Sequence, residues 1–187
     1  MTSARGFARW LSVAAIITGV ALVSYVAGVY LQARAHENSF HGPSAATAPS
    51  MAMPRLVDGE AIGEISISRI GMRAVISQGD SDAVLRVGAG HLADTPWPGQ
   101  PGNVVIAGHR DTVFRPLRNV REGDLVDVTT ETTVAHYRVV SAKIVSPTDL
   151  SVLKQNDGNS LTLITCYPFG FVGSAPERFI VRAAEIK

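Results

Sequence analysis

The chain has 187 residues, 46% of them hydrophobic, which is enough for one domain with its own core and an appended segment. Arg5, Arg9 and Arg34 are three of the 17 basic residues and precede the first acidic one, so the rest of the chain has 14 basic against 16 acidic side chains. That balance argues against nucleic acid as a partner. The single cysteine, Cys166, excludes an intramolecular disulfide.

Residues 10–31 form a stretch of 22 residues without a charged side chain, long enough to cross a bilayer as a helix. Because Arg5 and Arg9 precede it, residues 1–9 are predicted to be cytoplasmic and the domain that follows extracytoplasmic, in a single-pass protein of the cell membrane. A cleaved signal peptide is the alternative, since residues 33–35 read Ala-Arg-Ala. The apolar stretch is long for a signal peptide, which favours an uncleaved anchor.

Residues 32–58 contain many small residues and prolines and show no amphipathic period. This composition predicts a flexible linker that separates the anchor from a domain at residues 59–187.

The domain shows mostly strand signals, separated at short intervals by Gly, Pro and Asn-rich breakers. Many short strands punctuated in this way predict an all-β sandwich or a closed barrel. Helical signals are few and fall at residues 81–87, 114–120 and 149–155. Strands are expected near residues 62–68, 70–76, 104–107, 124–130, 135–140, 142–146, 160–166 and 178–183.

Cys166 ends one of these strands and is followed by Tyr-Pro-Phe-Gly. Pro168 cannot donate to a central strand ladder and Gly170 favours a turn, so the thiol is expected at the exposed end of the strand. That is a suitable position for a nucleophile. The alternative is a small buried apolar side chain.

Arg178 begins the last predicted strand. If residues 160–166 and 178–183 are antiparallel neighbours, Arg178 lies opposite Cys166 with Cβ atoms about 4.5–5.5 Å apart. The loop between the two strands would then form one wall of a groove beside the thiol. Taken alone, Arg178 fits an ordinary surface cation better, since most arginines are exposed, and only its register with Cys166 favours a functional role.

A cysteine nucleophile needs a base that later protonates the leaving amine, and the chain offers five histidines. His36 and His41 fall in the linker, and His136 fits a half-exposed strand position. His91 and His109 both follow a glycine. His109 is the better candidate because it directly follows a buried strand, which gives its ring a rigid support.

The sequence lacks the usual zinc-protease, phosphate-loop and α/β-hydrolase motifs, and its acidic residues are scattered. No cofactor and no metal ion are therefore expected.

The run Thr-Leu-Ile-Thr-Cys at residues 162–166, with Ala-Gly-His at residues 107–109 and Arg178 downstream, resembles the sortase family of cysteine transpeptidases. The resemblance covers residues 59–187, and residues 102–111, 166–169 and 175–179 look most like class D members.

The resemblance implies a closed eight-stranded β-barrel with short helices. It also implies a thioacyl intermediate on Cys166, acid and base catalysis by His109, and support of the substrate or the oxyanion by Arg178. The implied partners are exported proteins with a C-terminal Leu-Pro-x-Thr-Gly-like sorting signal and an amine acceptor of the cell envelope.

Two further residues are candidates for substrate binding. Thr165 could donate its hydroxyl to the bound signal, although it could simply favour the strand. His91 is expected to matter less than His109. Two other functions remain open: a cysteine peptidase of the same fold that mainly hydrolyses, and a non-catalytic anchored barrel that binds peptide signals.

Overall fold

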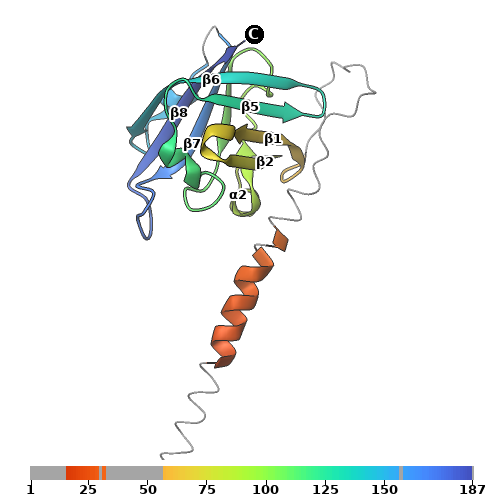
Figure 1. Ribbon diagram of the computed structural model, residues 1–187, viewed down its shortest axis with the longest axis vertical. Helices are drawn as coiled ribbons and strands as arrows, with labels where there is room; N and C mark the ends of the chain where they lie inside the picture. Colours follow the sequence, from red (N-terminus) through yellow and green to blue (C-terminus); the bar gives the residue numbers. More distant parts are fainter. Residues whose placement is uncertain (1–15, 30, 33–56, 156–157, 187) are drawn as a thin grey trace, which may run out of the picture.

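The computed structural model describes residues 16–29, 31–32, 57–155 and 158–186 (Figure 1). Its main body is a closed β-barrel with the strand order β1-β2-β3-β4-β7-β8-β6-β5, which confirms the predicted eight-stranded barrel. The strands are β1 (Ala61–Ile67), β2 (Met72–Gln78), β3 (Ala89–His91), β4 (Asn103–Ala107), β5 (Leu125–Thr130), β6 (Val134–Val145), β7 (Ser160–Tyr167) and β8 (Glu177–Ile186).

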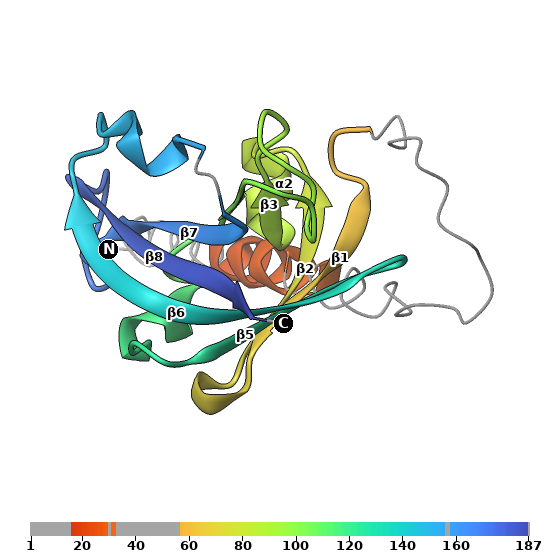
Figure 2. The same ribbon diagram turned by 90° about the horizontal axis from the view of Figure 1, so that it is seen from above.

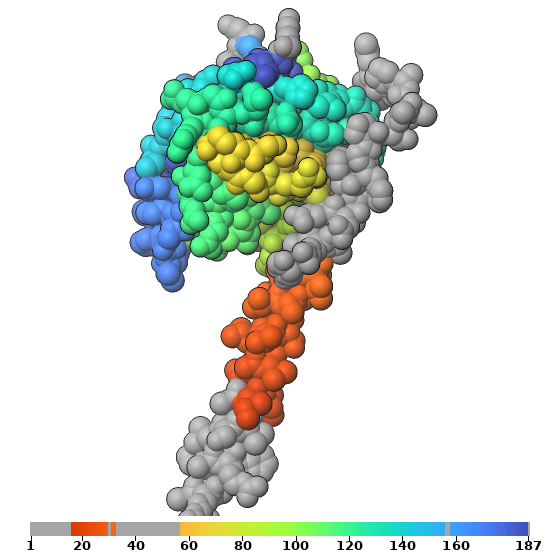
Figure 3. Space-filling view, in the orientation of Figure 1, coloured from red at the N-terminus to blue at the C-terminus, as the bar shows by residue number. Residues whose placement is uncertain are grey.

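Two neighbouring pairs in the barrel, β2 with β3 and β4 with β7, are parallel, and the other six pairs are antiparallel. Figure 2 shows β6, β7 and β8 running side by side on one part of the wall. In Figure 3 the hairpin of β1 and β2 forms a yellow strip on the face in view, between cyan segments above it and green segments below it.

The barrel is filled by alternating apolar side chains, because successive residues of a strand point to opposite faces. Ile65 and Ile67 of β1 are fully buried, as the alternation with serine predicts. Phe114 and Leu117, from the connection between β4 and β5, pack into the same core. Burial of each such side chain contributes about 1.5–3 kcal/mol. The largest buried side chains include Tyr137, Phe114, Ile65, Ile67, Met72, Ile76, Ile106, Leu117, Leu161, Leu163 and Ile180.

Two strands differ from the sequence-based prediction. The two strands expected at residues 135–140 and 142–146 are one strand, β6, whose pairing with β8 continues across an irregularity between Val139 and Ser141. A β-bulge absorbs one residue without ending the strand. The second difference is β3, which was not predicted because Gly90 reads as a loop residue. A side chain there would have its Cβ 2.3 Å from the Gly79 carbonyl oxygen, so the close strand approach requires glycine.

The helical segments are short. α2 (Asp82–Val87) agrees with the predicted helix, while the other two predicted helices are single 3₁₀ segments, η2 (Arg115–Asn119) and η3 (Leu150–Leu153). A third, η1 (Ser68–Ile70), links β1 to β2.

Part of the predicted anchor is also described. Residues 16–29 and 31–32 are helical, and apolar side chains such as Val20, Leu22 and Val23 are exposed along them. Within the described ranges, no helix is both long enough and apolar enough to cross a bilayer. Residues 10–15 and 30 of the predicted anchor, and residues 33–56 of the predicted linker, lie outside the described residues.

Candidate active site

Cys166 and Arg178 face each other across two strands. β7 and β8 are antiparallel, and Cys166 pairs directly with Arg178, as predicted from the sequence. Directly paired residues project from the same face of a sheet. Because Leu163 and Val181 of these strands point into the core, the alternating pattern puts Cys166 and Arg178 on the outer face of the barrel, where both are partly exposed.

His109 reaches the same edge of the barrel from β4. β4 and β7 are parallel, with Ala107 paired to Ile164, so two residues further along each chain are His109 and Cys166. The backbone N–H of Gly108 still donates to the Ile164 carbonyl, at 3.1 Å, which extends this register beyond β4. The register thus places the three predicted catalytic residues at one edge of the barrel, at or just past the ends of three neighbouring strands.

Gly108 fixes how the chain leaves β4 before His109. A Cβ at this position would lie 2.8 Å from the ring of Phe114, so only glycine fits without displacing a core side chain. On the other side, the His109 carbonyl accepts a hydrogen bond of 3.1 Å from the Phe114 backbone N–H. His109 is therefore carried on a backbone that is held at both ends.

Thr165 is 2% exposed, and its hydroxyl donates to the Gly108 carbonyl at 2.7 Å. This bond links the residue before Cys166 to the residue before His109. The hydroxyl thus helps to hold the two strand ends together, while the predicted role of Thr165 in binding a sorting signal stays a prediction.

Arg178 is held by the loop that precedes it. Its Nη1 donates to the carbonyl oxygens of Ala175, at 3.3 Å, and Glu177, at 3.0 Å. Its Nε and Nη2 find no hydrogen-bond partner among the described residues. A guanidinium oriented in this way has donors left for an anionic group beside Cys166.

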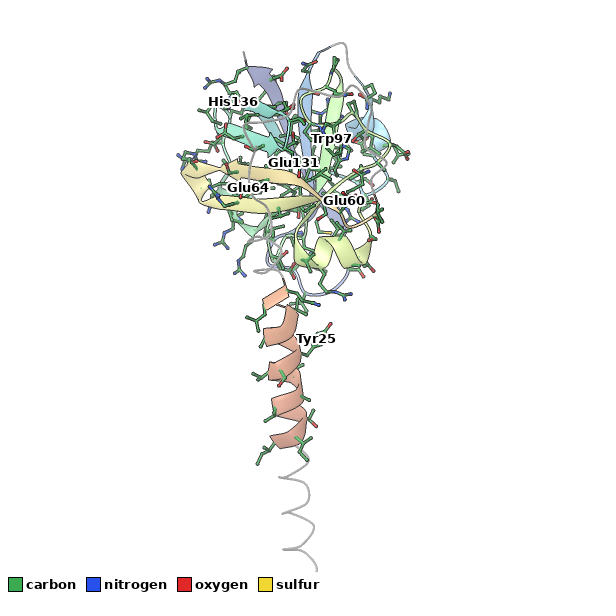
Figure 4. The ribbon with its side chains drawn as sticks, turned by 90° about the vertical axis from the view of Figure 1, so that its right-hand side faces the viewer. Tyr25, Glu60, Glu64, Trp97, Glu131 and His136 are labelled. Atoms are coloured by element: carbon green, nitrogen blue, oxygen red, sulfur yellow. The ribbon has the colours of Figure 1, made fainter. Side chains whose placement is uncertain are left out.

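His91 lies in a different setting from His109. It is 2% exposed, with Nδ1 3.0 Å from Gln78 Oε1 and Nε2 2.9 Å from the Pro96 carbonyl oxygen. Its ring also packs edge-on against Trp97, which is labelled in Figure 4, with centroids 5.7 Å apart. These contacts give His91 a clear structural role in tying β2 to the segment before β4. Its predicted contribution to substrate binding stays a prediction.

Burial lowers the pKa of His91, although the hydrogen bond to Pro96 acts in the opposite direction. The folded protein therefore binds a proton at His91 less readily than the unfolded chain does, where the pKa is about 6.5. The contribution of His91 to the free energy of unfolding is therefore fully present above the unfolded pKa. It is lost as the pH falls from there toward the lower pKa of His91 in the folded protein. We expect the urea midpoint to decrease between pH 7.5 and pH 5, and to decrease less in His91→Gln. Equal decreases in both proteins would contradict this origin of the pH dependence.

Comparison with known proteins identifies the family. A family model described as "Sortase domain" matches residues 65–186, which is more than half of the chain. The chain belongs to the sortase family. The match includes both strand ends that carry Cys166 and His109, as well as Arg178.

Among individual sortases, the chain is 37% identical over 124 residues to sortase D of Bacillus subtilis, covering 66% of this chain and 63% of that protein. It is 29% identical over 109 residues to sortase A of Listeria monocytogenes, covering 56% of this chain and 49% of that protein. The chain thus spans less than two thirds of the length of either relative. Among solved structures, a Clostridium perfringens sortase D5 transpeptidase matches with a TM-score of 0.65 and 36% identity, over 71% of this chain and 83% of that one.

One buried polar residue of this sortase barrel was missed by sequence reasoning. Asn103 is fully buried; its Nδ2 donates to the carbonyls of Val152, at 3.0 Å, and Lys154, at 3.3 Å, and its Oδ1 accepts from the Thr162 hydroxyl at 2.7 Å. These bonds hold the η3 segment over the outer face of β4 and β7. An asparagine that begins an apolar strand was the available signal, because a buried amide needs several partners.

The part of the chain that the structure describes contains no group of three or more His, Cys, Asp or Glu side chains that could hold a metal ion. A separate pocket of about 520 Å³ lies away from Cys166, His109 and Arg178. Its lining residues are Arg69, Ile70, Arg118, Asn119, Val120 and Arg121.

Proposed function

We propose that this sortase is a transpeptidase in which Cys166 is the nucleophile, His109 the acid and base, and Arg178 the stabiliser of the oxyanion. The observation that carries the proposal is the direct pairing of Cys166 with Arg178, with His109 at the same edge through the β4–β7 register. This combination supplies a thiol, an imidazole and a fixed cation at one partly exposed place.

The first half of the reaction forms a thioester. The Cys166 sulfur, as thiolate with the proton held by His109, attacks the carbonyl carbon of the scissile peptide bond. The carbonyl oxygen becomes negative and accepts hydrogen bonds from Arg178. When the C–N bond breaks, His109 gives its proton to the departing amine, which leaves an acyl group bonded to Cys166.

The second half releases the acyl group. An incoming amine attacks the thioester carbonyl, and His109 takes the proton that this nitrogen loses. The C–S bond then breaks and the thiolate is restored. Water can replace the amine in the same step, so the balance between transfer and hydrolysis depends on which nucleophile reaches the thioester first.

The substrate proposed for this site is an exported protein with a C-terminal Leu-Pro-x-Thr-Gly-like signal, and the acceptor is an amine of the cell envelope. Family membership supports this choice. The partial exposure of Cys166 and Arg178 on the outer face of the barrel supports it as well, because a protein substrate must reach the thiol from solvent.

We also propose that residues 10–31 anchor the protein in the cell membrane as a single-pass helix, with the N-terminus in the cytoplasm and the barrel outside. The support is the 22-residue stretch without charge and the two arginines that precede it. Recovery of a membrane-free mature protein that begins near residue 36 would instead indicate a cleaved signal peptide.

The test of the proposed function is cleavage of a Leu-Pro-x-Thr-Gly peptide by the purified full chain, with and without an added amine such as triglycine. We expect a ligated product in the presence of the amine, at the expense of the hydrolysed one. Hydrolysis that the amine leaves unchanged would indicate a peptidase of the same fold. Binding of the peptide without cleavage would indicate a non-catalytic barrel.

A further inference from the structure

Arg110 follows His109 directly, but its side chain reaches the loop of residues 168–176 that connects β7 to β8. Its Nη2 donates to the carbonyl oxygens of Phe171, at 2.7 Å, and Gly173, at 2.9 Å. The guanidinium carbon also lies 5.9 Å from the centre of the Phe171 ring, within the range of a cation–π contact. One side chain therefore joins two segments that are about 60 residues apart in the chain.

These contacts matter because of where the loop begins and ends. The loop leaves β7 just after Cys166 and enters β8 just before Arg178. Arg110, the residue after His109, binds the middle of this loop through its side chain. The contact therefore connects the backbone segments that carry all three proposed catalytic residues.

The middle of the loop, residues 170–174, has few other contacts that could hold it in place. Phe171 is 46% exposed and Val172 is 94% exposed, so burial of their side chains contributes little there. The only backbone hydrogen bond donated by residues 170–174 to a described residue is that from Phe171 to the Pro168 carbonyl, at 3.2 Å. A segment with few buried contacts opens easily unless another group restrains it.

The side chain of Arg110 is also partly buried rather than extended into solvent. Its Nη1 is shielded from solvent and has no hydrogen-bond partner among the described residues. A shielded donor without a partner is unfavourable, so the bonds of Nη2 and the contact with Phe171 must offset it. An arginine that served only for solubility would extend into water instead.

We propose that Arg110 is a positioning residue that holds the loop of residues 168–176 against the His109 segment and thereby fixes the loop beside Cys166, where the substrate peptide would bind. The catalytic part of this inference rests on the proposed function. The loop restraint does not, since it follows from the contacts of Arg110 alone.

Loss of the guanidinium should free the loop and weaken peptide binding. Two hydrogen bonds from a charged donor are lost, so we expect kcat/KM of Arg110→Gln to fall by about 10- to 100-fold, mainly through a higher KM. Arg110→Lys keeps the charge but loses the planar fork that contacts two carbonyls and a ring face together. Its KM should lie between those of the native protein and Arg110→Gln.

Limited chymotrypsin digestion of the full chain tests the restraint without any substrate. Cleavage after Phe171, identified by mass spectrometry, reports how often the loop opens. We expect this cleavage to be about tenfold faster or more in Arg110→Gln, with a smaller increase in Arg110→Lys. The matched control is Arg138→Gln on β6, which also removes an arginine that donates to a backbone carbonyl, that of Gly123 at 3.4 Å. The control should leave cleavage after Phe171 unchanged.

Unchanged cleavage after Phe171 in Arg110→Gln would overturn the proposal, whatever the activity. A fall in kcat at constant KM would also overturn it, because it would place Arg110 in the chemical step. If Arg110→Gln melts at a much lower temperature than the native protein, the cleavage rate and KM of Arg110→Lys are compared with those of the native protein instead. Absence of peptide cleavage by the native protein would contradict the proposed function and leave the digestion result standing.

Discussion

Replacement of Cys166 with alanine is expected to reduce cleavage of a cognate sorting peptide by at least about 10³-fold, because a methyl group cannot form the thioester. Separation of the peptide products by chromatography measures the rate. The fold should be retained, since Cys166 is partly exposed at a strand end and contributes little to the core. Equal melting temperatures of the two proteins provide the control. Turnover well above the trace level in Cys166→Ala would mean that another residue is the nucleophile.

Replacement of His109 with alanine is expected to lower kcat/KM by about 10²- to 10⁴-fold, the usual contribution of a positioned acid and base. His91→Ala is the matched comparison, because both histidines follow a glycine near the ends of adjacent strands. The buried ring of His91 contacts Gln78, Pro96 and Trp97, so its loss should act mainly on stability.

The two histidine variants are distinguished by measuring kcat/KM and the melting temperature together. We expect His109→Ala to lose activity at a nearly unchanged melting temperature, and His91→Ala to melt earlier with a smaller loss of activity. Full activity in His109→Ala would remove His109 from the mechanism. Equal losses of activity at unchanged melting temperatures would leave the base unassigned.

The pairing of Cys166 with Arg178 was predictable from the sequence because its determinants are local. Two apolar runs of similar length are joined by a loop rich in proline and glycine, and such runs usually pair as antiparallel neighbours. The length of that loop places the last residue of one strand opposite the first residue of the next. The structure shows this register.

The place of His109 was predictable only in part. That it follows a buried strand is visible in the sequence, but the parallel pairing of β4 with β7 joins segments more than 50 residues apart, and no local pattern specifies it. The bond from Thr165 to Gly108 and the contacts of Arg110 with the loop depend on this same pairing. These contacts form only once the distant segments have paired in the folded barrel. Residue types and spacing in the sequence therefore could not predict them.

The histidines show how environment separates two similar sequence contexts. Gly-His at residues 90–91 lies inside a three-residue strand whose residues are all buried, so His91 is enclosed. Gly-His at residues 108–109 lies just past a strand end, so His109 stays partly exposed. The buried strand before His109 is visible in the sequence, whereas the partners that enclose His91 appear only in the structure.

The most direct test of the account is the intact mass of the protein after brief incubation with a Leu-Pro-x-Thr-Gly peptide and an acid quench, in the absence of an added amine. We predict a mass increase equal to the acyl fragment of the peptide, located on Cys166, removed by hydroxylamine as a thioester should be, and depleted when triglycine is present. Peptide cleavage without any adduct on Cys166 under conditions of rapid turnover, or the same adduct in Cys166→Ala, would contradict the account.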